Sequence, residues 1–167
     1  MIRTTLAGCA LAGVTAALLT GCGGSAKASA SDATIQREAA LYEIDQIEAK
    51  FHHATSTQNL KLMMSLFAPG AVFNVGDQTL TGKAEIRHWF ATAAPFQPGN
   101  HWESDTPTYK LRATVNGNKG TLYFECHYID PKTQKVVHYV AVQHEVQKIG
   151  GRWLITNSSA TPAVLKP

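Results

Sequence analysis

The sequence contains few cysteine residues, and their positions leave no pair for a disulfide bond in the folded part of the chain. The three cysteines are Cys9, Cys22 and Cys126. The first two belong to an N-terminal segment with its own purpose, described below, so only Cys126 remains in the domain. We therefore expect the core alone to hold the fold, even in an oxidising compartment. Cys126 lies on an apolar face of a predicted strand, which indicates a small buried hydrophobic residue rather than a nucleophile.

Several other features are absent. The main apolar run, residues 6–19, is shorter than the ~20 apolar residues that span a membrane. Lysine and arginine are scattered without a basic block, so we expect no nucleic-acid partner. There is no His-x-x-x-His motif or cysteine pair, and His52 and His53 point about 100° apart on a helix, so we expect no metal and no cofactor. The chain also lacks a serine nucleophile elbow, a glycine-rich phosphate loop and a convincing cysteine–histidine pairing.

The N-terminal segment has the three parts of an export signal. Arg3 is positively charged, residues 6–19 are apolar, and small residues lead to Cys22. The stretch LTGC, residues 19–22, resembles the bacterial lipobox, which implies cleavage before Cys22 and attachment of lipid there. An ordinary secretory signal, cut at a nearby small residue, is the alternative.

The predicted organisation follows from this segment. Residues 1–21 are the signal peptide, residues 22–33 are the lipidated cysteine and a flexible Gly/Ser/Ala tether, residues 34–162 are the domain, and residues 163–167 are a short tail. The protein is then exported and membrane-anchored through lipid on Cys22, in the cell membrane or the outer membrane, and its domain faces outside the cytoplasm.

The domain begins with helical spacing and ends with strand patterns. Apolar residues from Ile35 to Ala54 recur at helical intervals, and a shorter helix follows until Pro69 and Gly70. The remaining expected elements are two short strands at residues 71–75 and 78–80, a helix after Gly82 that ends at Pro95, and strands at residues 101–115, 120–129, 135–149 and 152–158. This order predicts a single α+β domain, in which a curved, mostly antiparallel sheet wraps around three N-terminal helices as a cone-shaped barrel.

Three stretches carry a resemblance to a known family. FHHATSTQNLKLMMSLFAPGAVF, TGKAEIRHWF and VQHEVQKIGGRWLIT occur in an order and at a spacing that resembles the SnoaL-like, polyketide cyclase-like group of the nuclear transport factor 2-like superfamily. The resemblance covers residues 35–160 and implies a pocket between the concave face of the sheet and the helices. Members of this superfamily catalyse reactions or only bind ligands there, so the fold does not decide the function.

Strand alternation and the resemblance nominate the site residues. His144 shares a valine-rich face with His138 and Val140, so we expect it to point into the pocket. The resemblance places a pocket histidine near His101. These two are the candidate acid/base groups, although an inward histidine is often only a satisfied core residue. The candidate ligand-binding residues are Phe51, Phe67, Trp89, Phe90, Tyr109, Tyr128 and Val142.

The chain departs from the catalytic pattern that the resemblance implies. Catalytic members carry a tyrosine and, five residues later, an aspartate near the end of the first helix, and these positions are Phe51 and Ser56 here. A further family aspartate corresponds to Gly70. The missing phenol and carboxylates favour a binding domain over an enzyme.

Three functions stay open. The first is a lipid-anchored domain that binds a small apolar or amphipathic molecule. The second is a cofactor-free enzyme of isomerase, cyclase or dehydratase type, in which His101 or His144 transfers a proton. The third is a homodimer or protein-interaction module that uses the outer face of the sheet, with Tyr123, Glu125, His127, Tyr139 and Gln143.

Overall fold

The computed structural model describes residues 30–104 and 109–162 of the 167-residue chain. The predicted signal peptide, Cys22 and the tail at residues 163–167 lie outside the described residues. Among the described residues, no helix combines the length and the apolarity needed to cross a bilayer.

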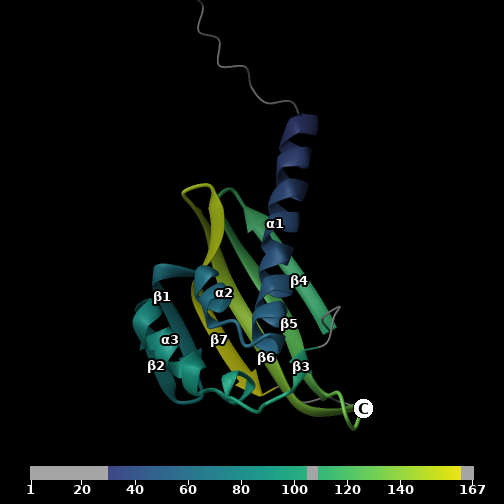
Figure 1. Cartoon of the computed structure of the whole chain (residues 1–167). Coiled ribbons are helices and arrows are strands. Elements are labelled where there is room, and N and C mark those ends of the chain that lie inside the picture. Colours follow the sequence, from purple (N-terminus) through teal and green to yellow (C-terminus); the bar gives the residue numbers. More distant parts are fainter. Residues whose placement is uncertain (1–29, 105–108, 163–167) are drawn as a thin grey trace, which may run out of the picture.

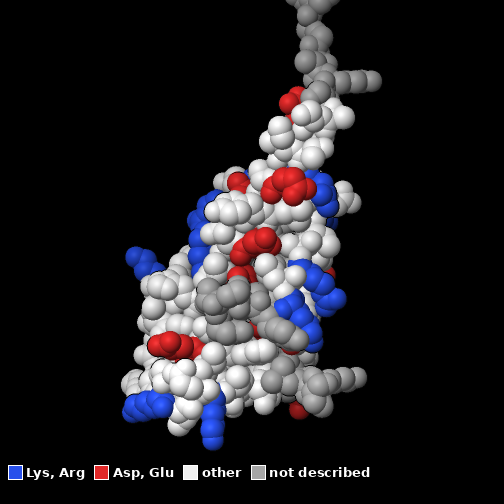
Figure 2. Space-filling view, turned by 90° about the vertical axis from the view of Figure 1, so that its right-hand side faces the viewer, with Lys and Arg blue, Asp and Glu red and all other residues white. Residues whose placement is uncertain are grey.

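Helix α1 (Ala30–Ser56) begins slightly before its predicted start and extends beyond the sheet. Its first turns project from one end of the molecule in two perpendicular views (Figures 1 and 2). Residues 30–39 are all exposed, and Ile35, which we expected to pack inward, is 64% exposed. The buried stripe starts at Ile44 and continues through Ile47 and Phe51, so only the second half of α1 is part of the core.

Helix α2 (Leu60–Ser65) is shorter than predicted. It begins at an N-cap, where the Asn59 side chain accepts a hydrogen bond from the Leu62 N–H at 2.9 Å. Phe67 already pairs with Ile155 of the last strand, so strand β1 (Phe67–Val75) starts there and includes Pro69 and Gly70. The prediction that these two residues stop a helix was therefore wrong.

The next elements follow their predicted places closely. Strand β2 (Gln78–Thr81) pairs with β1 across the Gly76–Asp77 turn, where Gly76 has a φ of +55°. Helix α3 (Gly82–Thr92) ends before the short 3₁₀ helix η1 (Ala94–Phe96), which contains Pro95.

The long strand predicted for residues 101–115 is instead two strands. Strands β3 (Glu103–Ser104) and β4 (Tyr109–Asn116) lie on either side of residues 105–108 and both pair with β5 (Lys119–Asp130). Lys110 has a φ of +53°, and the register of β4 against β5 shifts there. This irregularity breaks the alternation of faces along the strand that was predicted for residues 101–115.

The strands form one curled sheet with the order β2-β1-β7-β6-β5-β3, with β4 also paired to β5. Strands β6 (Lys135–Ile149) and β7 (Arg152–Pro162) are its long centre, and all pairs are antiparallel except β1 with β7. The sheet curves around the helices without closing into a barrel (Figure 1). The predicted α+β class and the curved sheet are thus confirmed.

Gly120 lies at a crowded contact between β5, β4 and α1. A Cβ atom at this position would lie 2.9 Å from the Ile44 Cδ1 and 2.5 Å from the Thr114 carbonyl oxygen. A side chain would push the Thr114 carbonyl of β4 away from β5 and would require the end of the Ile44 side chain to shift, so glycine here permits the close approach of both.

Candidate functional site

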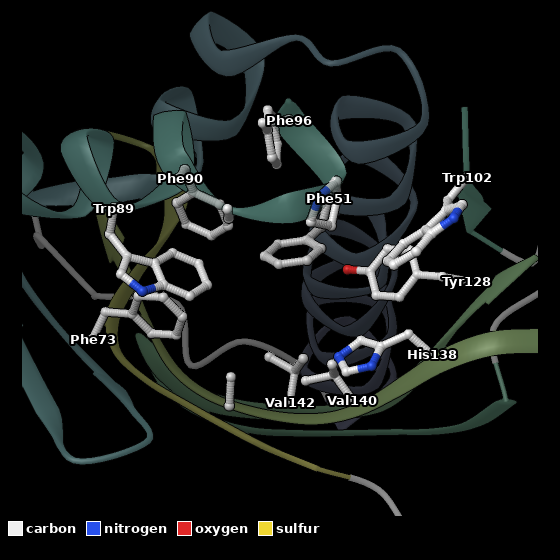
Figure 3. Close-up of a pocket in the computed structure, with 13 residues that line it drawn as sticks. Phe51, Phe73, Trp89, Phe90, Phe96, Trp102, Tyr128, His138, Val140 and Val142 are labelled. Carbon is white, nitrogen blue, oxygen red and sulfur yellow. The ribbon is translucent and has the colours of Figure 1, made fainter. Parts of the chain in front are cut away.

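A cavity of about 260 Å³ lies between the concave face of the sheet and the segment that contains α3 and η1 (Figure 3). A mostly apolar, concave space with a few polar groups is typical of small-molecule sites. Its walls come from α1, β1, α3, η1, β5, β6, β7 and the loop before β3. The lining residues are Phe51, Phe73, Trp89, Phe90, Ala93, Pro95, Phe96, Trp102, Tyr128, His138, Val140, Val142 and Ala160.

One end of the cavity is a cluster of aromatic rings. Phe73 and Phe90 stack with their ring centroids 5.6 Å apart, and Trp89 meets Phe73 edge-on at 5.1 Å. Phe51 contacts Phe90 at 6.1 Å. These rings face the valines of β6 (Figure 3), so a ligand at this end meets carbon atoms on all sides.

The opposite end carries the polar groups. His138 lies near-parallel to both Tyr128 and Trp102, with ring centroids 6.0 Å and 6.3 Å away. The Tyr128 hydroxyl points toward the middle of the cavity (Figure 3). His138 is exposed whereas Tyr128 is buried, so this end grades from an apolar interior to solvent.

Five of the seven predicted ligand-binding residues line this cavity. They are Phe51, Trp89, Phe90, Tyr128 and Val142. Phe67 lies outside the lining, fully buried in the core and 6.1 Å from the Phe90 ring. Tyr109 belongs to β4 and pairs with Glu125, and its side chain lies outside the described part.

His101 does not line the cavity, which corrects our expectation. It precedes β3, and its side chain is 47% exposed. Its Nε2 lies 3.7 Å from the Asp130 Oδ1. Backbone N–H groups of Lys132 and Thr133, followed by the His101 ring, lower the pKa of Asp130 against the opposing effect of desolvation. His101 is therefore part of a surface cluster at the turn between β5 and β6.

His144 is buried inside the domain, as the alternation indicated, but behind the cavity lining rather than in it. Its ring packs 5.5 Å from Phe124 and 5.8 Å from Phe51. Neither ring nitrogen has a hydrogen-bond partner among the described residues, and the same holds for the Ser158 hydroxyl on the neighbouring strand. Burial lowers the pKa of His144 to about 3, so the imidazole is neutral in the folded protein.

Ser56, at the position of the family aspartate, has a structural contact. Its Oγ accepts a hydrogen bond from the Ser104 N–H at 2.9 Å. This bond ties the end of α1 to β3.

A second polar cluster lies behind the cavity and contradicts the expectation that Cys126 has no histidine partner. The His52 Nε2 lies 2.9 Å from the Cys126 Sγ, and the His52 Nδ1 lies 2.8 Å from the Glu48 Oε1. All three side chains are buried. We call Glu48, His52 and Cys126 the thiol cluster. Among the described residues, no three His, Cys, Asp or Glu side chains are arranged to hold a metal ion.

The outer face of the sheet carries the residues considered for a protein interface. Glu125 accepts hydrogen bonds from the Tyr123 hydroxyl at 2.8 Å and from the Lys110 Nζ at 3.2 Å. Desolvation alone would raise the pKa of Glu125, but these two bonds lower it overall. His127 meets Tyr139 edge-on at 6.0 Å on the same face. Glu125 is thus turned to its own neighbours within the sheet.

Sequence reasoning missed three parts of these sites. His138 was placed on the correct face of its strand, but its position at the cavity end depends on Trp102, which is distant in sequence. For Phe73, the only indication in the sequence was the alternation of apolar residues along β1, which did not identify it as a cavity residue. Glu48 and His52 are four residues apart, a spacing that puts them on one face of a helix, and this signal was available in the sequence.

Comparisons with known proteins give the same fold. The family model described as the SnoaL-like domain matches residues 49–154. The chain is similar to an NTF2-like protein with a cystatin-like fold from Novosphingobium aromaticivorans, at 14% identity, a TM-score of 0.67, and coverage of 83% of this chain and 92% of that one. No curated protein matches the chain.

Two further solved structures show the same architecture. An NTF2-like superfamily protein from Salmonella enterica has 15% identity and a TM-score of 0.62, and covers 77% of this chain and 95% of its own. A putative dehydratase of the NTF2-like family from Streptomyces avermitilis has 12% identity and a TM-score of 0.63, with 76% and 98% coverage. At these identities the likeness concerns the fold.

Proposed function

This chain belongs to the SnoaL-like domain family, and we propose that its domain binds a small amphipathic aromatic molecule in the cavity. The observation that carries the proposal is the polarity of the cavity from one end to the other. Phe73, Trp89 and Phe90 surround an apolar end, and Tyr128 and His138 mark the other. A ring with one polar substituent matches this gradient.

The size and the walls of the cavity limit the ligand further. At about 260 Å³ the space suits one or two rings rather than a long chain. The aromatic walls offer edge-to-face contacts to a flat ligand, each worth about 0.5–1.5 kcal/mol beyond buried area. The Tyr128 hydroxyl, which points inward (Figure 3), is placed to exchange a hydrogen bond with the ligand's polar group.

The test uses p-cresol and toluene, which differ only by a hydroxyl group. We expect p-cresol to raise the melting temperature of the full chain and to bind more tightly than toluene by about three- to tenfold, the value of one net hydrogen bond. Calorimetric titration and thermal denaturation measure both effects.

Two variants, each of which replaces an alanine by phenylalanine, make the test specific. Ala160→Phe should fill the cavity and abolish binding, because Ala160 lines it. Ala91→Phe introduces the same ring at an exposed position of α3 and should bind like the wild type. Equal binding in the two variants would place the ligand elsewhere and refute the proposal.

The enzymatic alternative has less support. Of its two candidate bases, His101 lies at the surface and His144 lies behind the cavity lining. The structural neighbour from Streptomyces avermitilis is named a putative dehydratase, but a fold shared at 12% identity does not transfer a reaction.

We propose in addition that lipid on Cys22 anchors this domain to a membrane. The lipobox-like sequence supports the proposal. Mass spectrometry of protein from its bacterial host should find an acylated N-terminal Cys22, and Cys22→Ala should release the domain from the membrane fraction. An unmodified Cys22 on a soluble wild-type protein would contradict the anchor.

A further inference from the structure

His138 lies at the solvent end of the cavity, and its imidazole is accessible from both sides. Its ring lines the cavity and is also exposed to solvent. Among residues 30–104 and 109–162, His138 has no hydrogen bond or ion pair with another group. The imidazole is therefore available to bind a ligand that enters the cavity from this end.

The fold places His138 beside a second polar group. His138 of β6 pairs with Tyr128 of β5 across the sheet, and the imidazole and the phenol hydroxyl both point into the cavity from the same end (Figure 3). The other end holds Phe73, Trp89 and Phe90. An aromatic ring that binds among these three side chains therefore directs a substituent toward the imidazole and the hydroxyl.

The charge of the cavity lining is one-sided. Among the described residues that line the cavity, His138 is the only basic side chain, and no lysine, arginine, aspartate or glutamate belongs to the lining. An ammonium substituent would lose its hydration here without meeting an opposite charge, whereas a carboxylate would meet an imidazolium. The lining thus favours an anionic substituent over a cationic one.

The rings next to His138 are compatible with a charged imidazole. Tyr128 and Trp102 lie near-parallel to it, with ring centroids 6.0 Å and 6.3 Å away. The face of an aromatic ring attracts a cation at about this distance. An imidazolium at this position therefore keeps favourable contacts with the protein while it binds an anion.

The other titratable groups around this end of the cavity are turned elsewhere. The Asp130 carboxylate accepts hydrogen bonds from N–H groups of the following turn and lies 3.7 Å from the His101 Nε2. Glu103 of β3 alternates to the opposite face of the sheet from Tyr128. The side chains that α1 and η1 contribute to the cavity do not titrate. The lysines of the turn and of the start of β6 are exposed, namely Lys132 and Lys135.

We propose that the ligand of this cavity is an aromatic carboxylate, whose oxygens accept hydrogen bonds from the His138 imidazolium and the Tyr128 hydroxyl. This inference rests on the proposed function, because it names the polar group of the molecule that binds there. A hydrogen bond between two ionised partners is about twice as strong as one between neutral partners. Binding therefore strengthens as the pH falls and His138 takes up a proton.

The experiment compares 4-methylbenzoate with 4-methylbenzamide, which has nearly the same shape but no charge. Calorimetric titration of the full chain measures both ligands at about pH 5.5 and about pH 8, on either side of the ordinary titration range of histidine, and circular dichroism verifies the fold at each pH. We expect 4-methylbenzoate to bind about tenfold more tightly at the lower pH and 4-methylbenzamide to bind equally at both. Binding of 4-methylbenzoate that does not change with pH would overturn the proposal.

Two variants of His138 separate its charge from its packing. His138→Gln stays polar but uncharged, so 4-methylbenzoate should bind about tenfold more weakly at the lower pH and without pH dependence. His138→Lys is positively charged at both pH values and should bind 4-methylbenzoate equally at both. His101→Gln, which removes the exposed histidine beside Asp130, is the matched control and should keep the wild-type pH profile. The same profile in His138→Gln would assign the proton to another group and refute the inference.

The comparison with p-cresol distinguishes this inference from the proposed function. If p-cresol binds the wild type but not Ala160→Phe, and 4-methylbenzoate shows no advantage over 4-methylbenzamide at either pH, the cavity prefers neutral ligands and only this inference is refuted. If Ala160→Phe and Ala91→Phe bind both p-cresol and 4-methylbenzoate equally, both proposals are refuted.

Discussion

At the scale of single residues, His144 shows how burial controls a titratable group. Its ring is fully buried and its two nitrogens have no partner among the described residues. Burial lowers the pKa from 6.5 to about 3, because an imidazolium in this position would lose its hydration.

This shift makes stability depend on pH in a defined direction. The unfolded chain binds a proton on His144 below about pH 6.5, while the folded protein does so only near pH 3. The contribution of His144 to folding is therefore fully present above about pH 6.5 and is lost as the pH falls toward 3, by up to about 1.4 kcal/mol per pH unit.

His144→Leu should remove this dependence. Urea denaturation between pH 6 and 4 measures the free energy of unfolding at each pH. As the pH is lowered, we expect this free energy to decrease less steeply in the variant than in the wild type, by the slope that corresponds to one proton. At pH 7 we expect the variant and the wild type to have similar free energies of unfolding. The stabilisation from removing two unpaired buried nitrogens offsets the cost of the altered side-chain shape. The control Phe124→Leu, beside the same ring, should lower stability equally at each pH, and parallel curves for wild type and His144→Leu would contradict the argument.

At the scale of elements, the contact between α1 and β5 depends on a missing side chain. Gly120 leaves room for Ile44 of the helix and for the Thr114 carbonyl of β4. The same helix carries Phe51, which lines the cavity, and His52, which contacts Cys126.

Gly120→Ala should therefore destabilise the domain by about 1–3 kcal/mol through overpacking. Gly70→Ala is the matched control, since a Cβ atom there meets nothing within 4 Å, and its effect should stay within about 0.5 kcal/mol. Urea unfolding of both variants measures the difference. Equal stabilities would mean that the contact of Gly120 with the Thr114 carbonyl and Ile44 is not as close as described.

At the scale of the whole molecule, α1 links two regions of different stability. Its residues 30–39 are exposed and project beyond the sheet (Figure 1), whereas Ile44 and Ile47 are buried. An exposed half-helix has little to hold it except its own hydrogen bonds, which are marginal at this length.

Hydrogen exchange along α1 should follow this division. We expect the amides of residues 30–39 to exchange with little protection and those of residues 47–55 to be protected nearly to the global free energy of unfolding, as read by mass spectrometry of the full chain. Uniform protection along the helix would show that a second copy or another partner covers its first turns.

The sequence by itself determined the fold class, most of the element order and the faces of the regular strands. Hydrophobic periodicity and turn residues indicate local geometry. A sheet with one buried face requires apolar and polar residues to alternate along each strand. Val142 and His144 were placed on the inner face of β6 for this reason, and the family motifs fixed the architecture.

Only the tertiary structure decided which of those residues share a site. His101, which the resemblance placed at the pocket, lies at the surface beside Asp130, and the packing of α1 on β5 brings His52 to Cys126, 74 positions away. The stack of Trp102, Tyr128 and His138 likewise joins three separate segments. Such groupings arise from how elements pack against one another, and packing is a property of distances that a local sequence pattern does not encode.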